Sequence, residues 1–159
     1  MIERLNRKKA LDILDFIQTI KDSFEDFYIT ENNERKFLKT LKFINKVLKY
    51  QSVFGLYRNG LKAIAIIYRT KGYRTYLKLL TSDYDSAKSM LRFLSWEVGD
   101  IDLYVKIKRN NFLSNILQKN WYSFVENRGE EILLLHKKRE LIKLFPKECD
   151  LIDETRRLY

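Results

Sequence analysis

The sequence predicts an α/β domain whose central sheet is mostly antiparallel and is flanked by helices. Two observations support this prediction. Segments with apolar residues at helical spacing alternate along the chain with segments of strand-like character. Asn59-Gly60 separates two of the strand-like segments, and this dipeptide favours the positive φ angles of a tight hairpin turn. With 159 residues, 45% of them hydrophobic, the chain is long enough for one domain with a substantial core.

The N-terminal part of the sequence predicts a strand and two helices. Residues 1–5 are expected to form a short strand, and Asn6 is a suitable N-cap for the first helix. The apolar residues of that helix recur at helical spacing: Ala10, Leu11, Ile13, Leu14, Ile17, Ile20 and Phe24. A second helix is predicted from about Thr30, a good N-cap, to about Lys49. Its apolar face consists of Phe37, Leu38, Leu41, Ile44 and Leu48.

The opposite face of the second predicted helix is basic. At about 100° per residue its cations fall within one narrow stripe, and nothing acidic neutralises the stripe along this helix. Such a stripe is typical either of a solvated helix face or of a docking site for an acidic protein or nucleic acid. The residues of this basic stripe are Arg35, Lys39, Lys42, Lys46 and Lys49.

The rest of the chain alternates between strands and helices. Residues 53–57, 61–69 and 73–80 predict an antiparallel three-strand meander. A helix over residues 82–98 is expected to stop at Gly99, and residues 100–107 alternate as a half-buried strand does. A short helix over 111–119 precedes a hairpin of residues 121–126 and 131–136. The chain then becomes polar and breaks at Pro146, so residues 1–138 are expected to form the domain and 139–159 a helical extension.

Composition excludes several classes of protein. The chain has 31 Lys and Arg against 21 Asp and Glu, and this net charge of +10 favours an acidic partner or a phosphorylated cofactor unless the charges are simply solvated. The longest apolar runs are too short to cross a bilayer, and the N-terminus lacks an apolar signal core, so a cytoplasmic protein without a membrane partner is expected. Cys149 and His136 are single, which excludes an intrachain disulfide and multi-histidine metal sites. No metal site is expected.

The order helix, helix, three-strand meander, helix, strand, helix, hairpin resembles the GNAT acetyltransferase superfamily over residues 1–138. The most specific part runs from Asn110 to Tyr122 and leads into the last hairpin. There Lys119-Asn120-Trp121-Tyr122 resembles the family's Lys-x-Gly-Phe. The resemblance implies an acyl-CoA-dependent N-acyltransferase that uses acetyl-CoA and an amine acceptor, which the sequence does not identify.

The resemblance also implies where the cofactor would bind. Strands 73–80 and 100–107 would splay apart, the backbone of Leu79, Leu80 and Thr81 would hold the pantetheine, and Asn110 would contact the acyl end. The pyrophosphate would lie on the N-terminus of the helix over 82–98, where free N–H groups favour phosphate. The family's glycine-rich turn is replaced there by a segment without glycine, and Asp83 and Asp85 would repel a phosphate. Ser82 and Asp85 are expected to form a capping box. The implied pyrophosphate residues are Asp85, Ser86, Ala87 and Lys88.

No catalytic residue can be assigned from the sequence. Acylation of an amine needs a base and often a donor for the departing thiolate. The family commonly places a donor tyrosine on the late helix, and Leu117 stands at that position. Weak candidates for the donor are Tyr122, Tyr104 and Ser114. Candidates for the base are Glu97, Asp102 and Glu126, although each is better explained as a solvated surface carboxylate.

A second function is compatible with the same fold. The chain would then be a non-catalytic module that binds an acidic partner or nucleic acid through the basic stripe and the tyrosines and arginines of the meander. The two functions predict different structures. An enzyme should have an open cleft between strands 73–80 and 100–107, whereas a binding module can have that cleft filled with side chains.

Overall fold

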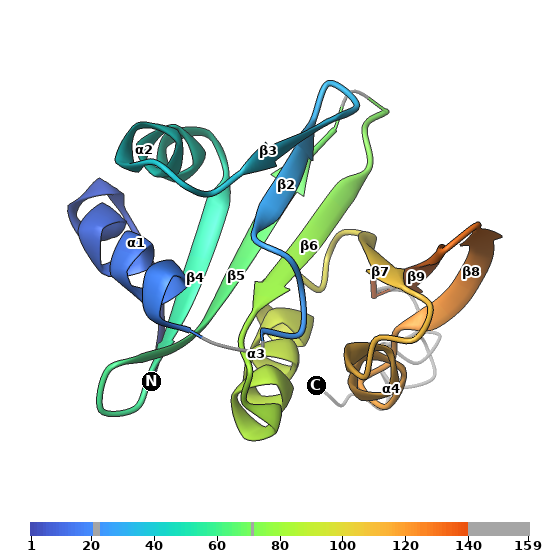
Figure 1. Cartoon of the computed structure of the whole chain (residues 1–159). Helices are drawn as coiled ribbons and strands as arrows, with labels where there is room; N and C mark the ends of the chain where they lie inside the picture. Colours follow the sequence, from blue (N-terminus) through green and yellow to red (C-terminus); the bar gives the residue numbers. More distant parts are fainter. Residues whose placement is uncertain (21–22, 71, 140–159) are drawn as a thin grey trace, which may run out of the picture.

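The computed structural model describes residues 1–20, 23–70 and 72–139, and Figure 1 shows their arrangement. The C-terminal extension, with Pro146 and Cys149, lies outside the described residues. The elements in chain order are β1 (Ile2–Arg4), a 3-10 helix (Arg7–Lys9), α1 (Ala10–Thr19), β2 (Tyr28–Glu31), β3 (Glu34–Phe37), α2 (Leu41–Tyr50), β4 (Ser52–Tyr57), β5 (Leu61–Arg69), β6 (Thr75–Leu80), α3 (Tyr84–Glu97), β7 (Leu103–Lys108), α4 (Leu113–Gln118), β8 (Ser123–Arg128) and β9 (Glu131–His136).

The central sheet has seven strands in the order β1-β4-β5-β6-β7-β9-β8, and β2 and β3 form a separate hairpin. All neighbours in the large sheet are antiparallel except β6 and β7. The prediction of an α/β domain with a mostly antiparallel sheet is therefore confirmed. The predicted meander is confirmed as β4, β5 and β6, and Asn59 and Gly60 have the positive φ angles that their turn requires.

Helices cover both faces of the sheet. Alternate residues of β5 belong to different apolar clusters, because successive side chains of a strand point to opposite faces. Ala63, Ala65 and Ile67 pack in the cluster that contains α3 and α4, while Ile64 and Ile66 pack in the cluster that contains α1 and α2. The β2–β3 hairpin lies on the α1–α2 side, in front of β5 and β6 in Figure 1.

The second predicted helix is wrong in its first half. Residues 30–37 belong to the β2–β3 hairpin, and α2 begins only at Leu41 with Thr40 as its N-cap. The Thr40 hydroxyl accepts a hydrogen bond from the Phe43 N–H at 3.1 Å. The turn of the hairpin is Asn32-Asn33, with φ angles of 50° and 65°. Asparagine tolerates this left-handed conformation, so the local turn chemistry outweighs the helical spacing of the apolar residues that follow.

Other boundaries shift by a few residues. The first helix ends at Thr19, before the predicted positions Ile20 and Phe24, and Leu11 is exposed. Asn6 caps the 3-10 helix that leads into α1, by accepting a hydrogen bond from the Lys8 N–H, whereas the N-cap of α1 itself is Lys9. The expected capping box of Ser82 and Asp85 is wrong, because Asp83 is the N-cap of α3.

The only described parallel pair of strands, β6 and β7, is short. β6 and β7 are paired at Thr75–Leu103 and Tyr76–Tyr104, and no further pair follows. β6 nevertheless continues to Leu80 and β7 to Lys108, so the two strands diverge. Figure 1 shows that the strands diverge toward the start of α3 and toward α4, and we call the region between them the wedge.

Candidate active-site cleft

A segment of the chain itself occupies the wedge between β6 and β7. Residues 24–26, which precede β2, are bonded to both walls. On the β6 side, the Phe24 N–H donates to the Thr81 carbonyl at 2.8 Å, and the Leu79 N–H donates to Glu25 Oε2 at 2.9 Å. On the β7 side, Asn111 Nδ2 donates to the Phe24 carbonyl. We call residues 24–26 the wedge segment.

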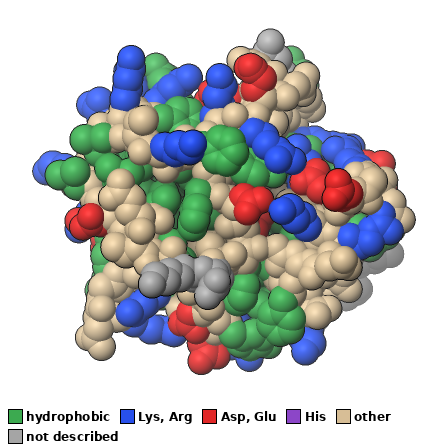
Figure 2. Space-filling view, viewed as in Figure 1, with side chains coloured by type: hydrophobic (Ala, Val, Ile, Leu, Met, Phe, Trp, Pro, Cys, Tyr) green, Lys and Arg blue, Asp and Glu red, His purple; other side chains and the backbone are tan. Residues whose placement is uncertain are grey.

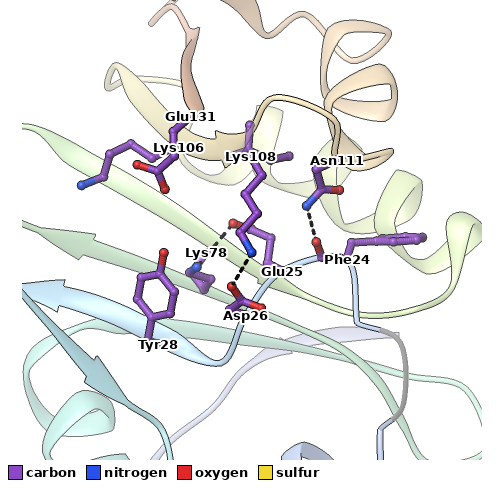
Figure 3. A pocket seen from close by; sticks show the side chains of 10 residues that line it. Phe24, Glu25, Asp26, Tyr28, Lys78, Lys106, Lys108, Asn111 and Glu131 are labelled. Carbon is purple, nitrogen blue, oxygen red and sulfur yellow. Dashed lines mark hydrogen bonds and ion pairs between the residues drawn. The ribbon is translucent and has the colours of Figure 1, made fainter. Parts of the chain in front are cut away.

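Two ion pairs add to these hydrogen bonds, as Figure 3 shows. Glu25 Oε1 lies 3.4 Å from Lys78 Nζ, and the two side chains are only 4% and 7% exposed. Burial raises the pKa of Glu25 even though the lysine and the Leu79 N–H act in the opposite direction. Lys78 Nζ also lies 4.1 Å from the centre of the Tyr28 ring. At the mouth of the wedge, the exposed Lys108 and Asp26 are 3.5 Å apart.

Two cavities lie near the wedge segment, which lines the first of them. The first has a volume of about 120 Å³ and lies between residues 24–28 and the strands, with Lys78, Lys106 and Glu131 in its wall. The second has a volume of about 420 Å³ and lies between the start of α3 and α4, lined by Tyr84, Phe112, Asn115, Ile116, Gln118 and Lys119. Phe24 lines the first cavity, and its ring packs 6.3 Å from that of Phe112 in the wall of the second.

The structure brings most of the predicted cofactor residues to this wedge. Leu79, Leu80 and Thr81 lie on its β6 wall and are buried. Asp85, Ser86, Ala87 and Lys88 form the first turns of α3, as expected. Asn110 is exposed, whereas Asn111 next to it reaches into the wedge. The missed residues are Glu25, Asp26, Lys78 and Lys108.

One signal in the sequence could have found part of this set. Lys78 stands among apolar residues in a strand of which every residue is buried. A lysine is rarely buried without a partner, so this position predicts a carboxylate nearby.

The N-terminus of α3 is already occupied by a carboxylate. Asp83 accepts a hydrogen bond from the Asp85 N–H at 3.2 Å, and its other oxygen accepts one from the Ser86 hydroxyl. The residues as arranged therefore do not fit acetyl-CoA. The Leu79 N–H and the Thr81 carbonyl are engaged, the wedge is filled, and the helix N-terminus is capped by an anion.

The predicted catalytic candidates are not gathered at the wedge. Tyr122 is buried in the core, which raises its pKa. Glu97 is the last residue of α3, about 20 Å along the axis from the helix start. Tyr104 lies on β7 beneath the guanidinium of Arg74, 4.7 Å from its ring centre. The remaining candidates also have other roles: Asp102 accepts the Lys138 N–H, Glu126 pairs with Arg128, and Ser114 is buried in α4. Leu117, at the position of the family's donor tyrosine, is buried in the same helix.

The predicted basic stripe does not exist as one helix face. Only Lys42, Lys46 and Lys49 lie on α2, because Arg35 belongs to β3 and Lys39 precedes the helix. The stripe is not free of acids either, since Lys46 Nζ lies 3.4 Å from Glu31 Oε1. Figure 2 shows Lys and Arg side chains on this face with hydrophobic and acidic side chains between them. An interface for nucleic acid or an acidic partner loses its strongest support.

Two further absences hold for the described part of the chain. Its His, Cys, Asp and Glu residues form no group of three or more that could hold a metal ion. Among its helices, none combines the length and the apolar character that crossing a membrane requires.

Comparison with solved structures identifies the fold. An N-acetyltransferase from Staphylococcus aureus Mu50 matches with a TM-score of 0.68 and 18% identity, over 86% of this chain and 96% of that one. A GNAT-family acetyltransferase from Streptococcus pneumoniae matches with a TM-score of 0.58 and 14% identity, over 85% and 96% of the two chains. An acetyltransferase from Salmonella typhimurium, solved with its cofactor acetyl-CoA, matches with a TM-score of 0.57 and 9% identity, over 94% and 98%.

The chain is a GNAT-fold protein. No family model matches the sequence, and no curated protein matches it either. One local feature agrees with the resemblance seen in the sequence. Trp121 stands where the Lys-x-Gly-Phe pattern has its glycine, and it adopts a φ of 69°, the left-handed conformation that glycine favours.

Proposed function

We propose that this chain is an acyl-CoA-dependent N-acyltransferase, with acetyl-CoA as the acyl donor and an amine as the acceptor. The observation that carries the proposal is the wedge, where β6 and β7 stop pairing after two residue pairs within the fold of the N-acetyltransferases. The Leu79 N–H points into this wedge instead of completing a sheet ladder. The acetyl-CoA in the Salmonella typhimurium structure supports the choice of cofactor.

The proposal requires the wedge segment to move. Leu79 and Thr81 are engaged by Glu25 and Phe24, so acyl-CoA and the segment compete for the same backbone groups. Asp83 and Asp85 oppose a phosphate at the start of α3, while Lys88 in the same helix and Lys119 in the second cavity offer positive charge. The affinity for acyl-CoA is therefore expected to be modest.

Calorimetric titration of the full chain with acetyl-CoA and with CoA, at low and at moderate salt, tests the proposal. Saturable binding that persists at moderate salt would support it and justify a screen of amine acceptors. Asp85→Gly should tighten binding, because it removes a repulsive charge without touching the wedge segment. Asp12→Gly, which removes the same charge from the first turn of α1, serves as the control. Absence of binding by the wild type, by Asp85→Gly and by Glu25→Ala/Lys78→Met, which weakens the wedge segment, would refute the proposal.

A second candidate function is a non-catalytic GNAT-fold module. The filled wedge favours it, because side chains occupy the place where an enzyme is expected to be open. The Asp83 cap at α3 favours it as well. The two candidates differ in one observable: a non-catalytic module binds no acyl-CoA even when the wedge segment is weakened. The basic residues no longer define one surface, so no class of partner is proposed for this module.

A further inference from the structure

We propose that the wedge segment is a built-in competitor of acyl-CoA, a gate that Glu25 holds closed. This inference rests on the proposed function, since it concerns how the cofactor of that function enters.

The wedge segment lines one of two neighbouring cavities. The larger cavity lies between α3 and α4, and the smaller one lies beyond Phe24, beside Lys78 and Lys106. The Phe24 ring lies in the wall of the smaller cavity, 6.3 Å from the Phe112 ring in the wall of the larger one. An acyl-CoA that reaches the Leu79 N–H and the Thr81 carbonyl has to displace Glu25 and Phe24 from these groups.

The contacts of the segment with β6 are those that an extended amide chain would make. The segment offers an N–H to the Thr81 carbonyl and an oxygen to the Leu79 N–H. Thus the segment mimics a ligand for the inner edge of the strand. Removing it leaves that edge with unsatisfied backbone groups, which a ligand with amide groups can satisfy.

Glu25 is the contact that decides how firmly the segment is held. Its carboxylate is the acceptor for Leu79 and the partner of Lys78, and it is almost fully buried. The ion pair of Asp26 with Lys108 is exposed and contributes little by comparison. In the open state the wedge segment has left the wedge. Weakening the contacts of Glu25 therefore raises the population of this state more than any other single change in the segment.

The expected effect follows from population arithmetic. When only a fraction of the molecules is open, the apparent dissociation constant equals the intrinsic one divided by that fraction. Loss of a charged, buried hydrogen bond together with its ion pair should raise a small open fraction about tenfold or more. The apparent dissociation constant for acetyl-CoA should fall by the same factor.

The experiment measures acetyl-CoA binding to the full chain by calorimetry. The test variant is Glu25→Ala/Lys78→Met. It removes the hydrogen bond of Glu25 to Leu79 and the ion pair with Lys78, and it leaves no buried charge unpaired. The control is Glu31→Ala/Lys46→Met, which removes an ion pair of the same 3.4 Å separation on the neighbouring hairpin and α2. Hydrogen exchange of the Phe24 amide, measured without ligand, reports whether the segment has been loosened, because neither substitution removes the bond of this amide to the Thr81 carbonyl. Circular dichroism establishes that each variant is folded.

The outcomes separate the gate from the proposed function. Binding about tenfold tighter in the test variant, faster exchange at Phe24 and no change in the control would support the gate. Equal or weaker binding in a folded test variant, while the wild type binds, would overturn the gate and leave the proposed function standing. No binding by any of the three proteins, although Phe24 exchanges faster in the test variant, would overturn the proposed function and the gate with it.

Discussion

Removing Lys78 should destabilise the protein because it leaves Glu25 buried without a partner. The two charges are 3.4 Å apart, which corresponds to an attraction of about 5 kcal/mol at an effective dielectric constant of about 20. Desolvation of the two ions offsets much of this attraction in the wild type. When one partner is removed from a buried pair, the typical cost is about 3–5 kcal/mol. We expect Lys78→Met to lower the free energy of unfolding by about 3 kcal/mol at pH 8.

A double-mutant cycle measures this coupling. Glu25→Gln/Lys78→Met keeps an acceptor for the Leu79 N–H and has no buried charge, so it should be within about 1 kcal/mol of the wild type. Urea unfolding followed by far-ultraviolet circular dichroism gives the four free energies. Lys46→Met, which breaks the exposed pair with Glu31, should change stability by less than about 0.5 kcal/mol. The reasoning fails if Lys78→Met matches that control, or if the double variant is as unstable as Lys78→Met alone.

Three further perturbations test other parts of the structure. Gly55→Ala should cost about 1–3 kcal/mol in urea unfolding, because a Cβ there would lie 2.9 Å from Leu5 Cδ1, whereas Gly72→Ala, whose Cβ would meet nothing closer than 3.9 Å, should not destabilise. Asp83→Ala should cost about 1 kcal/mol through loss of the N-cap of α3, measured in the same way. The pKa of Glu25 is raised in the folded state, so its contribution to stability is present below its unfolded value of 4.5 and is lost as the pH rises through the folded value. The free energy of unfolding of the wild type relative to Glu25→Gln should therefore decrease as the pH rises above about 4.5, and a flat difference would contradict the assignment.

Local signals in the sequence were sufficient for most of the large sheet. The meander followed from Asn59-Gly60 and the flanking apolar runs, since turn and strands agree there. The second helix failed because two local signals conflict. The spacing of Phe37, Leu38 and Leu41 favours a helix, while Asn32-Asn33 favours a turn. The structure has the turn, because the segments on either side of it pair as β2 and β3.

The site was only partly predictable, for a different reason. The β6 wall and the start of α3 followed from the resemblance, because they are set by element order. The partner of Lys78 did not, because Glu25 lies in an irregular segment far away in the sequence. No local pattern marks a carboxylate whose role depends on where a loop crosses a sheet.

Where two neighbouring strands of a sheet diverge, the edges that face each other have unpaired peptide groups, as the outer edge of any sheet has. The described edge of β6 beyond Tyr76 faces no strand, so its peptide groups must be satisfied by something other than a ladder. Water, a ligand or the chain itself can do this, and here Phe24 and Glu25 do. An empty wedge would therefore be the least favourable state of this fold. Sequence changes in the wedge segment are therefore constrained by the peptide groups of a strand that is distant in the sequence.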